Sequence, residues 1–578
     1  MADTTLGGAT GGRRLSLPAI PVGRLLIWLV AAYLVATTLW PLLRLFAEAL
    51  RSDEGRTLGI LLDQWQSRST GRALWNTLEA SALATLLSVL MGTAFAALVT
   101  LTNIRLKSAT VFALLLPLLI PSQITALAWI GLVGPSSPIL SAFGVAPAAG
   151  TTSPLYSKWG IVLVMGIEHA GLVFLTVRAA LIGLPRELVE AGRLAGAGGA
   201  RMVGAILIPL ALPSIIAGAA LSFVASIGNF GVPAFLGIPG RYSMMTTLIY
   251  QRLQGFGPSA LGEVASLALL LTLIAAAGLA LRALASRSFA TVVERGGGAM
   301  EPLDLGRWRL PAELTAWLTM LCVSILPLFA LLGTALIPAT GVPLSSETIT
   351  LSNFAFVLTE YASAQRAFVN SLLFALSAAI ISAAVALCLA YLGVFAKSRV
   401  ARALDLIADA PYAIPGTVLG IAIILVYLPP LPMLDVSIYN SFWIVLIAYL
   451  ARFLILALRP AVGALEALDP ALDEAGRMAG AGVGRRLIAI IVPAAAPALG
   501  AGAILIFMQA FNELTVSALL WSSGWETLGV VIFFLQREGN SVAAAALAVL
   551  TLSVTLLIAL LATAFARLLP KGVLPWHG

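Results

Sequence analysis

The amino-acid sequence predicts an all-α polytopic membrane protein, with twelve transmembrane helices arranged as two parallel six-helix repeats. Two observations lead to this fold class: the chain is too apolar to be soluble, and one segment of it occurs twice. Of the 578 residues, 60% are hydrophobic and only 10% are charged, whereas a soluble domain carries roughly 25% charged residues. Many of the apolar runs reach the ~20 residues that a helix needs to cross a bilayer.

Twelve apolar runs are long enough to be spans. In the first half they are 24–47, 78–101, 109–133, 159–182, 206–228 and 263–285, and in the second half 312–337, 371–396, 403–428, 439–460, 488–511 and 541–566. The polar residues before the first run carry Arg13 and Arg14, as a signal peptide would, but that run is long and no small-residue cleavage site ends it. We therefore expect an uncleaved first span.

The distribution of basic residues predicts the orientation. With the N-terminus in the cytoplasm, 23 of the 34 Lys and Arg residues fall inside, ten fall outside and one, Arg452, lies within a span. Because cytoplasmic segments carry the excess of Lys and Arg, both termini and the connection between the halves are expected to be cytoplasmic. The basic residues are spread among short loops and form no patch, which argues against a nucleic-acid partner.

One loop is repeated almost unchanged. It reads Glu-Ala-Gly-Arg-Leu-Ala-Gly-Ala at 190–197 and Glu-Ala-Gly-Arg-Met-Ala-Gly-Ala at 474–481, 284 residues later. Downstream the match continues in register, with Pro209, Pro213, Gly218 and Phe223 corresponding to Pro493, Pro497, Gly502 and Phe507. Upstream, Pro117 and Pro121 correspond to Pro411 and Pro415 at an offset of 294, so the first half has a longer external loop, placed around 134–158.

Six spans in each half, with both halves starting inside, predict parallel repeats related by an axis along the membrane normal. The predicted division is a cytoplasmic N-terminal tail 1–23, a first transmembrane repeat 24–285, a cytoplasmic linker 286–311, a second transmembrane repeat 312–567 and a C-terminal tail 568–578.

Each repeated loop is predicted to form a short helix across the cytoplasmic end of the bundle. Pro185 or Pro470 precedes it, Glu190 or Glu474 lies early in it, where the positive end of the helix dipole favours a carboxylate, and a glycine ends it. The alternative is a plain connector in which Ala and Gly are present only for their small size. Two copies in register, each at a fixed distance before a proline, favour a pair of docking points.

The motif resembles the hallmark of the membrane subunits of ATP-binding-cassette (ABC) importers: Glu-Ala-Ala, three residues, Gly, nine residues, Ile-x-Leu-Pro. Both copies match at that spacing, through Ile206-Leu207-Ile208-Pro209 and Ile490-Ile491-Val492-Pro493, with Gly192 or Gly476 in place of the second Ala and Ile208 or Val492 in place of Leu. The resemblance implies the type I ABC importer fold in a bacterial inner membrane.

The resemblance also implies the partners. Each loop would be a coupling helix that fits a groove on one of two copies of an ABC ATPase, and a periplasmic binding protein would deliver the substrate. The coupling residues would be Glu190, Ala191, Gly192, Arg193 and Gly196, and Glu474, Ala475, Gly476, Arg477 and Gly480. No Gly-x-x-x-x-Gly-Lys-Ser/Thr occurs in the chain, so we expect ATP to be hydrolysed by the partner, with no catalytic residues and no bound cofactor here.

The fused two-by-six layout resembles ferric-iron permeases, with thiamine permeases as close relatives. Ferric iron is the first expectation for the cargo, and thiamine, polyamines and organophosphonates remain alternatives. The segments 229–240 and 512–520 follow the fifth span of each half and are candidates for an external gate, or for ordinary Gly/Pro loops. A gradient-driven secondary transporter also has twelve spans in two parallel halves, but such a carrier needs no paired docking loops.

Polar residues within spans are functional candidates. Glu168 and Arg452 hold equivalent positions, 284 residues apart, and would either pair or line a polar path across the interface of the halves, or each be satisfied within its own half. His169 is expected to be a structural hydrogen-bonding residue. The candidates for the pathway or gate are Glu168, Arg452, Asn229, Asn512 and Glu513. No His, Cys and carboxylate cluster suggests a metal site, and Cys322 and Cys388 are expected to be small core residues.

Overall fold

The structure is a computed structural model in which helices make up all the regular structure of the described residues. These residues are 22–50, 58–135, 137–148, 150–184, 186–255, 260–288, 302–430 and 435–564. The predicted C-terminal tail, residues 1–21 of the predicted N-terminal tail and residues 289–301 of the predicted linker lie outside them. Within them, one isolated backbone bridge, between Thr102 and Leu303, has β geometry. The predicted all-α fold is therefore confirmed.

Eleven of the described helices are long and apolar enough to cross a membrane, and twelve if one bent pair counts as a span. The first half contains α1 (Val22–Leu34) with α2 (Trp40–Ala49), then α4 (Arg68–Leu101), α5 (Lys107–Leu119), α6 (Ser122–Val133), α8 (Lys158–Ile182), α11 (Ile208–Gly228) and α13 (Ala260–Ser288). The second half contains α14 (Arg309–Met320) with α15 (Leu326–Ala335), then α17 (Ala362–Val394), α18 (Arg399–Ala413), α19 (Gly416–Tyr427), α20 (Phe442–Glu466), α23 (Val492–Phe511) and α26 (Ser541–Ala564).

The third span of each half, expected at 109–133 and 403–428, is broken into two helices. Helix α5 ends before Pro121, and α18 ends before Pro415, where α19 turns away by 113°. Proline has no N–H to donate and disfavours helical backbone in the residue before it. Accordingly Ile120 and Ile414 are both extended, with ψ of 133° and 141°. The breaks lie at equivalent positions, so the duplication extends to this irregularity.

Two short segments after the fifth spans are buried in the bundle. The first runs through a π-helical turn at Pro233–Gly237 to α12 (Met245–Leu253), and the second through α24 (Ser517–Leu520) to α25 (Leu528–Arg537). Nearly every residue of 229–237 and 512–520 is buried. They are therefore part of the interior of the bundle.

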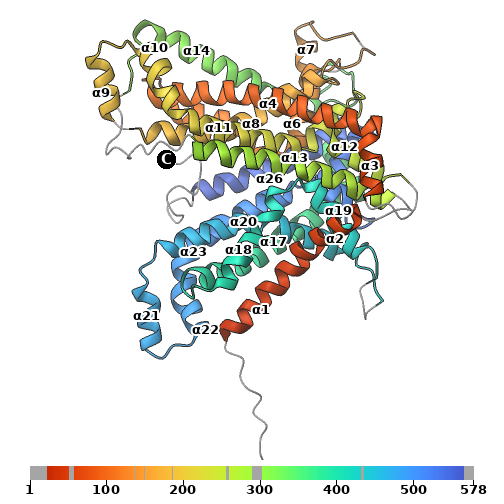
Figure 1. The fold of residues 1–578 in the computed structure, drawn as a ribbon. Helices are drawn as coiled ribbons and strands as arrows, with labels where there is room; N and C mark the ends of the chain where they lie inside the picture. The colour runs from red at the N-terminus through yellow and green to blue at the C-terminus, as the bar shows by residue number, and fades with distance from the viewer. Residues whose placement is uncertain are drawn as a thin grey trace, which may run out of the picture.

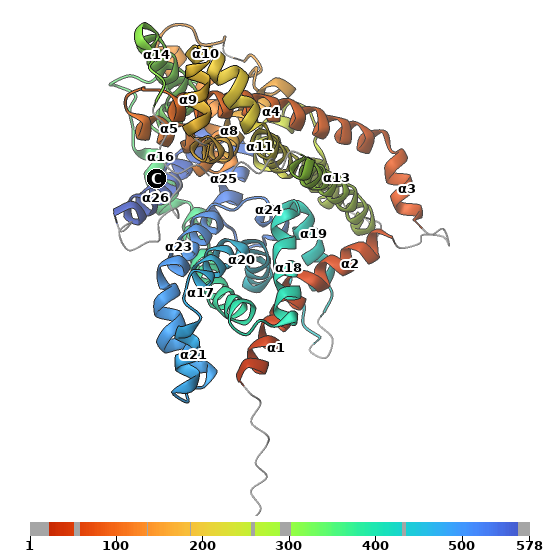
Figure 2. The same ribbon diagram turned by 60° about the vertical axis from the view of Figure 1, so that its left-hand side comes forward.

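The two halves exchange their first spans. Helices α1 and α2 pack against α18 and α19 of the second half (Figure 1; Figure 2). Helix α15 packs against α6 of the first half. The Tyr33 hydroxyl donates to the Leu450 carbonyl and the Tyr427 hydroxyl to the Ala36 carbonyl, both at 2.8 Å. The halves are thus consecutive in sequence but interlocked in space.

The end of the linker is attached to the first half. Leu303 N–H donates to the Leu101 carbonyl at 2.7 Å, and Asn103 donates through its side chain to Asp304 at 2.6 Å. Hydrogen bonds from the Gly306 amide and from Asn103 lower the pKa of the Asp304 carboxyl. The chain therefore enters the second half from a fixed point beside α4.

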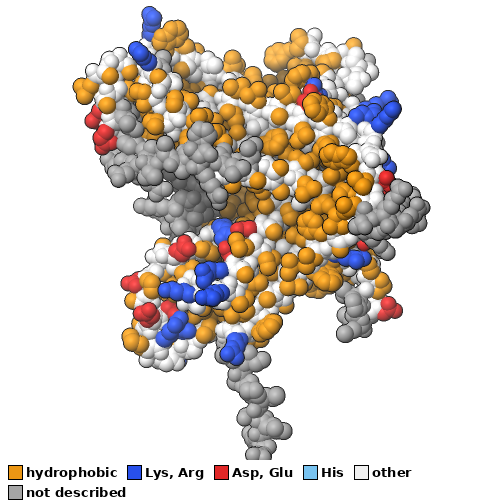
Figure 3. Space-filling model, viewed as in Figure 1, with side chains coloured by type: hydrophobic (Ala, Val, Ile, Leu, Met, Phe, Trp, Pro, Cys, Tyr) orange, Lys and Arg blue, Asp and Glu red, His pale blue; other side chains and the backbone are white. Residues whose placement is uncertain are grey.

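The outer faces of the bundle are apolar. Large apolar side chains are exposed along several spans, among them Trp28, Trp75, Leu90, Leu318, Phe329 and Ile380. Figure 3 shows apolar side chains spread over the flank of the bundle, with charged side chains gathered near the end that carries the second repeated loop. Surface of this extent on a soluble protein would be an association site; on spans of this length it is the surface that lipid covers.

Candidate functional site

Both repeated loops form the short helices that the motif predicts. Helix α9 (Arg186–Leu194) and helix α21 (Ala471–Met478) protrude at the same end of the bundle (Figure 1, left). Glu474 lies in the first turn of α21 as expected, whereas Glu190 lies in the middle of α9, where Glu187 occupies the first turn. Pro185 and the side chain of Arg193 lie outside the described residues.

Glycine ends both helices in the same way. Gly196 and Gly480 adopt φ of 75° and 73°, which is left-handed backbone that other residues adopt at a cost of roughly 1–2 kcal/mol. The following alanine amides donate back to Gly192 and Gly476 at 2.9 and 3.0 Å. This backward bond closes the C-terminus of each helix as in a Schellman motif.

Gly192 and Gly476, which stand where the motif has its second alanine, lie close against flexible side chains. A Cβ on Gly192 would lie 2.8 Å from the Met202 sulfur, and one on Gly476 would lie 3.1 Å from Arg486 Cδ. Met202 and Arg486 are equivalent residues, 284 apart, at the start of the chain that leads into the fifth span. Glycine therefore lets each short helix lie directly on that segment.

The outward surface of each helix is left uncovered. Glu190, Ala191, Glu474 and Ala475 are exposed, and so are the larger apolar side chains at the C-terminal ends. Leu194 is 90% exposed and its equivalent Met478 is 86% exposed. The exposed apolar side chain therefore stands in the same place on both helices.

The two helices are fastened to the bundle by different chemistry. In the second half, buried Asp473 accepts from Arg486 at 2.6 Å and from Arg477 at 2.9 Å. In the first half the equivalent residues are Val189 and Met202. The sequence analysis did not predict the Asp473–Arg486 ion pair. The signal for it was that these positions are acidic and basic in the second copy and apolar in the first.

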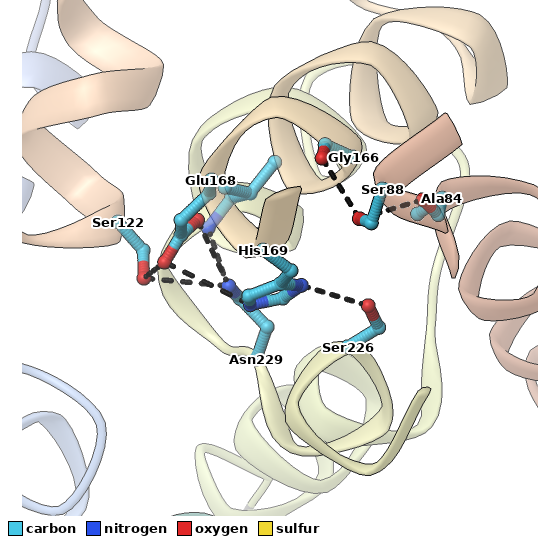
Figure 4. Close-up of polar contacts among 9 residues, drawn as sticks. Ala84, Ser88, Ser122, Gly166, Glu168, His169, Ser226 and Asn229 are labelled. Carbon is cyan, nitrogen blue, oxygen red and sulfur yellow. Dashed lines mark hydrogen bonds and ion pairs between the residues drawn. The ribbon is translucent and has the colours of Figure 1, made fainter. Parts of the chain in front are cut away.

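Glu168 is held within the first half by a small polar cluster (Figure 4). Ser122 donates to its Oε1 at 2.7 Å and Asn229 donates to its Oε2 at 3.3 Å. Beside it, His169 Nδ1 and the Ser226 hydroxyl lie 2.9 Å apart, in the structural role expected for this histidine. The break in the third span makes the cluster possible, because Ser122 is the first residue of α6 and directly follows Pro121.

The same three positions carry different residues in the second half, namely Gly416, Arg452 and Glu513. A Cβ on Gly416 would overlap Arg452 Nη1, so the guanidinium occupies space that a serine would need. That nitrogen is buried and has no hydrogen-bond partner among the described residues. The duplication therefore places a satisfied carboxylate in one half and an unsatisfied guanidinium in the other.

Asn229 and Glu513 share a second role as caps of the buried segments. Asn229 accepts from the Val232 amide at 3.1 Å. Glu513 accepts from the equivalent Val516 amide at 2.8 Å and from the Ser517 amide at 2.9 Å. A carboxylate or amide oxygen in this position satisfies N–H groups that have no partner within the turn.

A cavity of about 200 Å³ lies between the halves. Its wall includes Ser122, Gln123, Glu168, Arg452, Gln509, Asn512, Glu513 and Thr515. Four of the five candidate pathway residues therefore line one cavity. The fifth, Asn229, donates a hydrogen bond to one of them, Glu168. Gln123 donates to the Asn512 carbonyl across the interface at 2.8 Å. Within the described ranges, no group of His, Cys, Asp and Glu side chains could hold a metal ion.

An interlocked pair of helical repeats, with a polar cavity between them and one protruding helix on each, defines a transmembrane permease. The chain belongs to the family of binding-protein-dependent transport system inner membrane components, whose model matches residues 69–295 and 383–573. The matches leave out α1 and α2 in the first half and α14 and α15 in the second, which are the exchanged first spans.

Similar proteins agree with this assignment. A probable ABC transporter permease protein of Sinorhizobium fredii is 26% identical over 483 residues, which cover 81% of this chain and 82% of that protein. A putative ferric transport system permease protein of Haemophilus influenzae is 26% identical, covering 80% and 72%. A putative 2-aminoethylphosphonate transport system permease protein of Salmonella typhimurium is 28% identical over 246 residues, covering 41% and 84%.

The chain is therefore a multi-pass permease subunit of an ABC importer and is not itself an enzyme. Its class implies an ATPase and a substrate-binding protein as partners. The alternative of a gradient-driven secondary transporter is wrong.

Proposed function

We propose that this subunit forms the translocation pathway for ferric iron, delivered by a periplasmic binding protein. The observation that supports ferric iron as the cargo is the similarity to a ferric transport system permease protein along four fifths of the chain. An organophosphonate is the second candidate, favoured by the 2-aminoethylphosphonate permease relative and by the unpartnered Arg452 in the cavity. In either case the cavity between the halves is the point through which the cargo passes.

Two copies of a separate ATPase drive the cycle by docking on α9 and α21. The contact residues are Glu190, Ala191, Gly192, Arg193 and Gly196 on the first helix, and Glu474, Ala475, Gly476, Arg477 and Gly480 on the second. The support is geometric: both helices protrude at one end and both expose an apolar side chain at their tips. That end faces the cytoplasm of a bacterium, and the membrane is its inner membrane.

The buried segments at 229–237 and 512–520 act as the gate. They run back into the bundle at the far end of the fifth spans, and Asn229 and Glu513 cap their first turns. A hydrogen bond from Gln123 to the Asn512 carbonyl joins the second segment to the first half. Movement of the halves would break that bond, since its two partners belong to different repeats.

Reconstitution tests the cargo and the energy source together. The full chain is placed in liposomes with its ATPase and its binding protein, and uptake of ferric iron, 2-aminoethylphosphonate, thiamine and a polyamine is measured. We expect ATP-dependent uptake of ferric iron that persists when an ionophore dissipates all ion gradients. Uptake without the ATPase, or loss of uptake with the ionophore while ATP remains, would contradict the mechanism; uptake of one of the other compounds alone would reassign the cargo.

A further inference from the structure

Among the charged side chains that line the cavity, one has no hydrogen-bond partner among the described residues, and it is the positively charged Arg452. Glu168 accepts from Ser122 and Asn229, and both oxygens of Glu513 accept hydrogen bonds from the start of α24. Arg452 Nη1 is buried without a partner among the described residues. Buried donors are almost always paired, and this donor belongs to a charged group whose residue is otherwise partly exposed to the cavity. A donor left free in the wall of a transport cavity calls for an acceptor that is not part of the chain.

The N-terminus of α19 adds a second positive feature beside Arg452, in a cavity wall that also carries the carboxylates Glu168 and Glu513. The guanidinium lies against Gly416, the first residue of the twelve-residue helix α19. The first N–H groups of a helix lack partners within it and carry its positive dipole end. In the first half, the equivalent place holds Ser122 and a carboxylate. The exchange of Ser for Gly opens the space for Arg452, and the resulting site has two positive features side by side.

We infer that Arg452 is a cargo-binding residue that recognises an oxyanion, of the phosphonate, phosphate or carboxylate class. A guanidinium presents a planar set of donors that matches such groups. The cavity volume of about 200 Å³ suits a small anion. The described residues offer no set of ligands that could strip and hold a bare metal ion. This inference rests on the proposed role of the cavity as the transport path.

One ligand chemistry can come from two sources. The oxyanion is either the cargo itself or the anion that accompanies a ferric ion through the membrane. Arg452 would bind the same oxygen atoms in both cases. Gln509 and Thr515, which line the same cavity, offer polar groups to the rest of the cargo.

Binding to the full chain in lipid nanodiscs, without the ATPase, tests the site. Calorimetric titrations use 2-aminoethylphosphonate alone, inorganic phosphate alone, and ferric ion with citrate. The variants are Arg452→Gln, Arg452→Lys and Gly416→Ser. The matched control is Arg459→Gln, because Arg459 lies two turns further along α20 and is engaged by Asp405 and Asp409, away from the cavity.

We expect at least one oxyanion to bind the unaltered chain, and Arg452→Gln to weaken it about tenfold to hundredfold, as loss of a hydrogen bond to a charged group does. Gly416→Ser should weaken binding similarly because its hydroxymethyl group takes the place of Nη1, whereas Arg452→Lys should retain part of the affinity and Arg459→Gln all of it. Binding of the phosphonate or phosphate alone identifies the free anion as the ligand; binding only with ferric ion present identifies the accompanying anion.

Failure to bind any of the three ligands at millimolar concentration overturns the inference, as does equal binding by Arg452→Gln. If Arg452→Gln does not fold, Gly416→Ser and the rise in unfolding temperature that the anion gives the unaltered chain decide the question. The cargo proposal fails separately. If the chain binds an anion but liposomes show no ferric uptake, ferric iron is rejected as the cargo and the anion site at Arg452 is retained. If Arg452→Gln takes up ferric iron normally, the anion site is rejected and ferric iron is retained as the cargo.

Discussion

Glu168 and Arg452 occupy equivalent positions in the two halves and line one cavity, yet only Glu168 has its hydrogen bonds satisfied. Its partners, Ser122 and Asn229, belong to its own half. Arg452 leaves a buried Nη1 without a partner among the described residues. A fused pair of repeats can diverge in this way, because each copy of a position mutates independently once both are encoded in one chain. The cavity is consequently lined by two unlike halves.

The hydrogen bonds of Glu168 predict which residues are energetically coupled to it. We expect Glu168→Met and Ser122→Ala each to destabilise the protein, and the double change to cost about 1–2 kcal/mol less than the sum, because neither polar group is then left without its partner. For Glu168→Met combined with Arg452→Gln, the loss in free energy of unfolding should be closer to the sum of the two single losses. Thermal unfolding in detergent measures both cycles. A larger coupling between Glu168 and Arg452 than between Glu168 and Ser122 would show that the two charges interact directly across the cavity.

Much of this architecture was predictable because hydrophobic length and repetition are local properties of the sequence. The twelve apolar runs and the two short helices followed from spacing. Spacing also made Glu168 and Arg452 equivalent, but it left open whether they line one path or are each satisfied within their own half. The breaks at Pro121 and Pro415 were signalled by the prolines, but a proline within a span can also be tolerated, so length favoured a continuous helix. The exchange of first spans was not predictable, since apolar faces of similar composition do not specify which half they pack against.

The partners of individual polar groups were less predictable. Gly416 gives no sign in the sequence that it makes room for Arg452, because the effect depends on how α19 approaches α20. Asp473 and Arg486 are both visible in the sequence as charged residues of one copy, but their contact is not. It depends on the turn at Gly480, which brings residues thirteen apart together. Such contacts are set by tertiary geometry and not by period or propensity.

The Asp473–Arg486 pair can be tested with the residues that the first half uses. Asp473→Asn alone should destabilise the second loop strongly, by about 3–5 kcal/mol, because it leaves the buried Arg486 charge without its charged partner. Arg486→Met alone should cost less, because Arg477 still donates to Asp473. The double change Asp473→Val with Arg486→Met copies Val189 and Met202 and should recover most of the loss. Thermal unfolding together with hydrogen exchange of α21 measures this. A double variant as unstable as the worse single variant would contradict the equivalence of the two attachments.

The left-handed glycine of the second loop predicts a selective effect of one methyl group. Gly480→Ala should weaken the end of α21 by roughly 1–2 kcal/mol, the cost of left-handed backbone for a residue with a Cβ. Gly482→Ala is the matched control, since Gly482 has φ of −63° and no atom within 4 Å of its Cβ position. Hydrogen exchange of the 471–481 amides should rise in the first variant only. Equal effects of the two changes would mean that flexibility of the whole loop, and not this backbone conformation, is what matters.

The exposed carboxylates of the two short helices predict where the ATPase attaches. Glu190 and Glu474 are both exposed, so reversing their charge removes little from the fold itself. The double variant Glu190→Lys with Glu474→Lys should abolish transport and weaken co-purification of the ATPase, while its unfolding temperature stays near that of the unaltered chain. Each single variant should lose less, because one docking point remains.

Glu347→Lys, a charge reversal at an exposed residue in the segment between α15 and α17, is the control and should leave transport unchanged. Since surface charge reversals rarely change stability by more than about 0.5 kcal/mol, a transport defect in a well-folded double variant reports the interface. Normal uptake by that variant would show that the carboxylates are not part of the contact, and attention would then pass to Leu194 and Met478 at the tips.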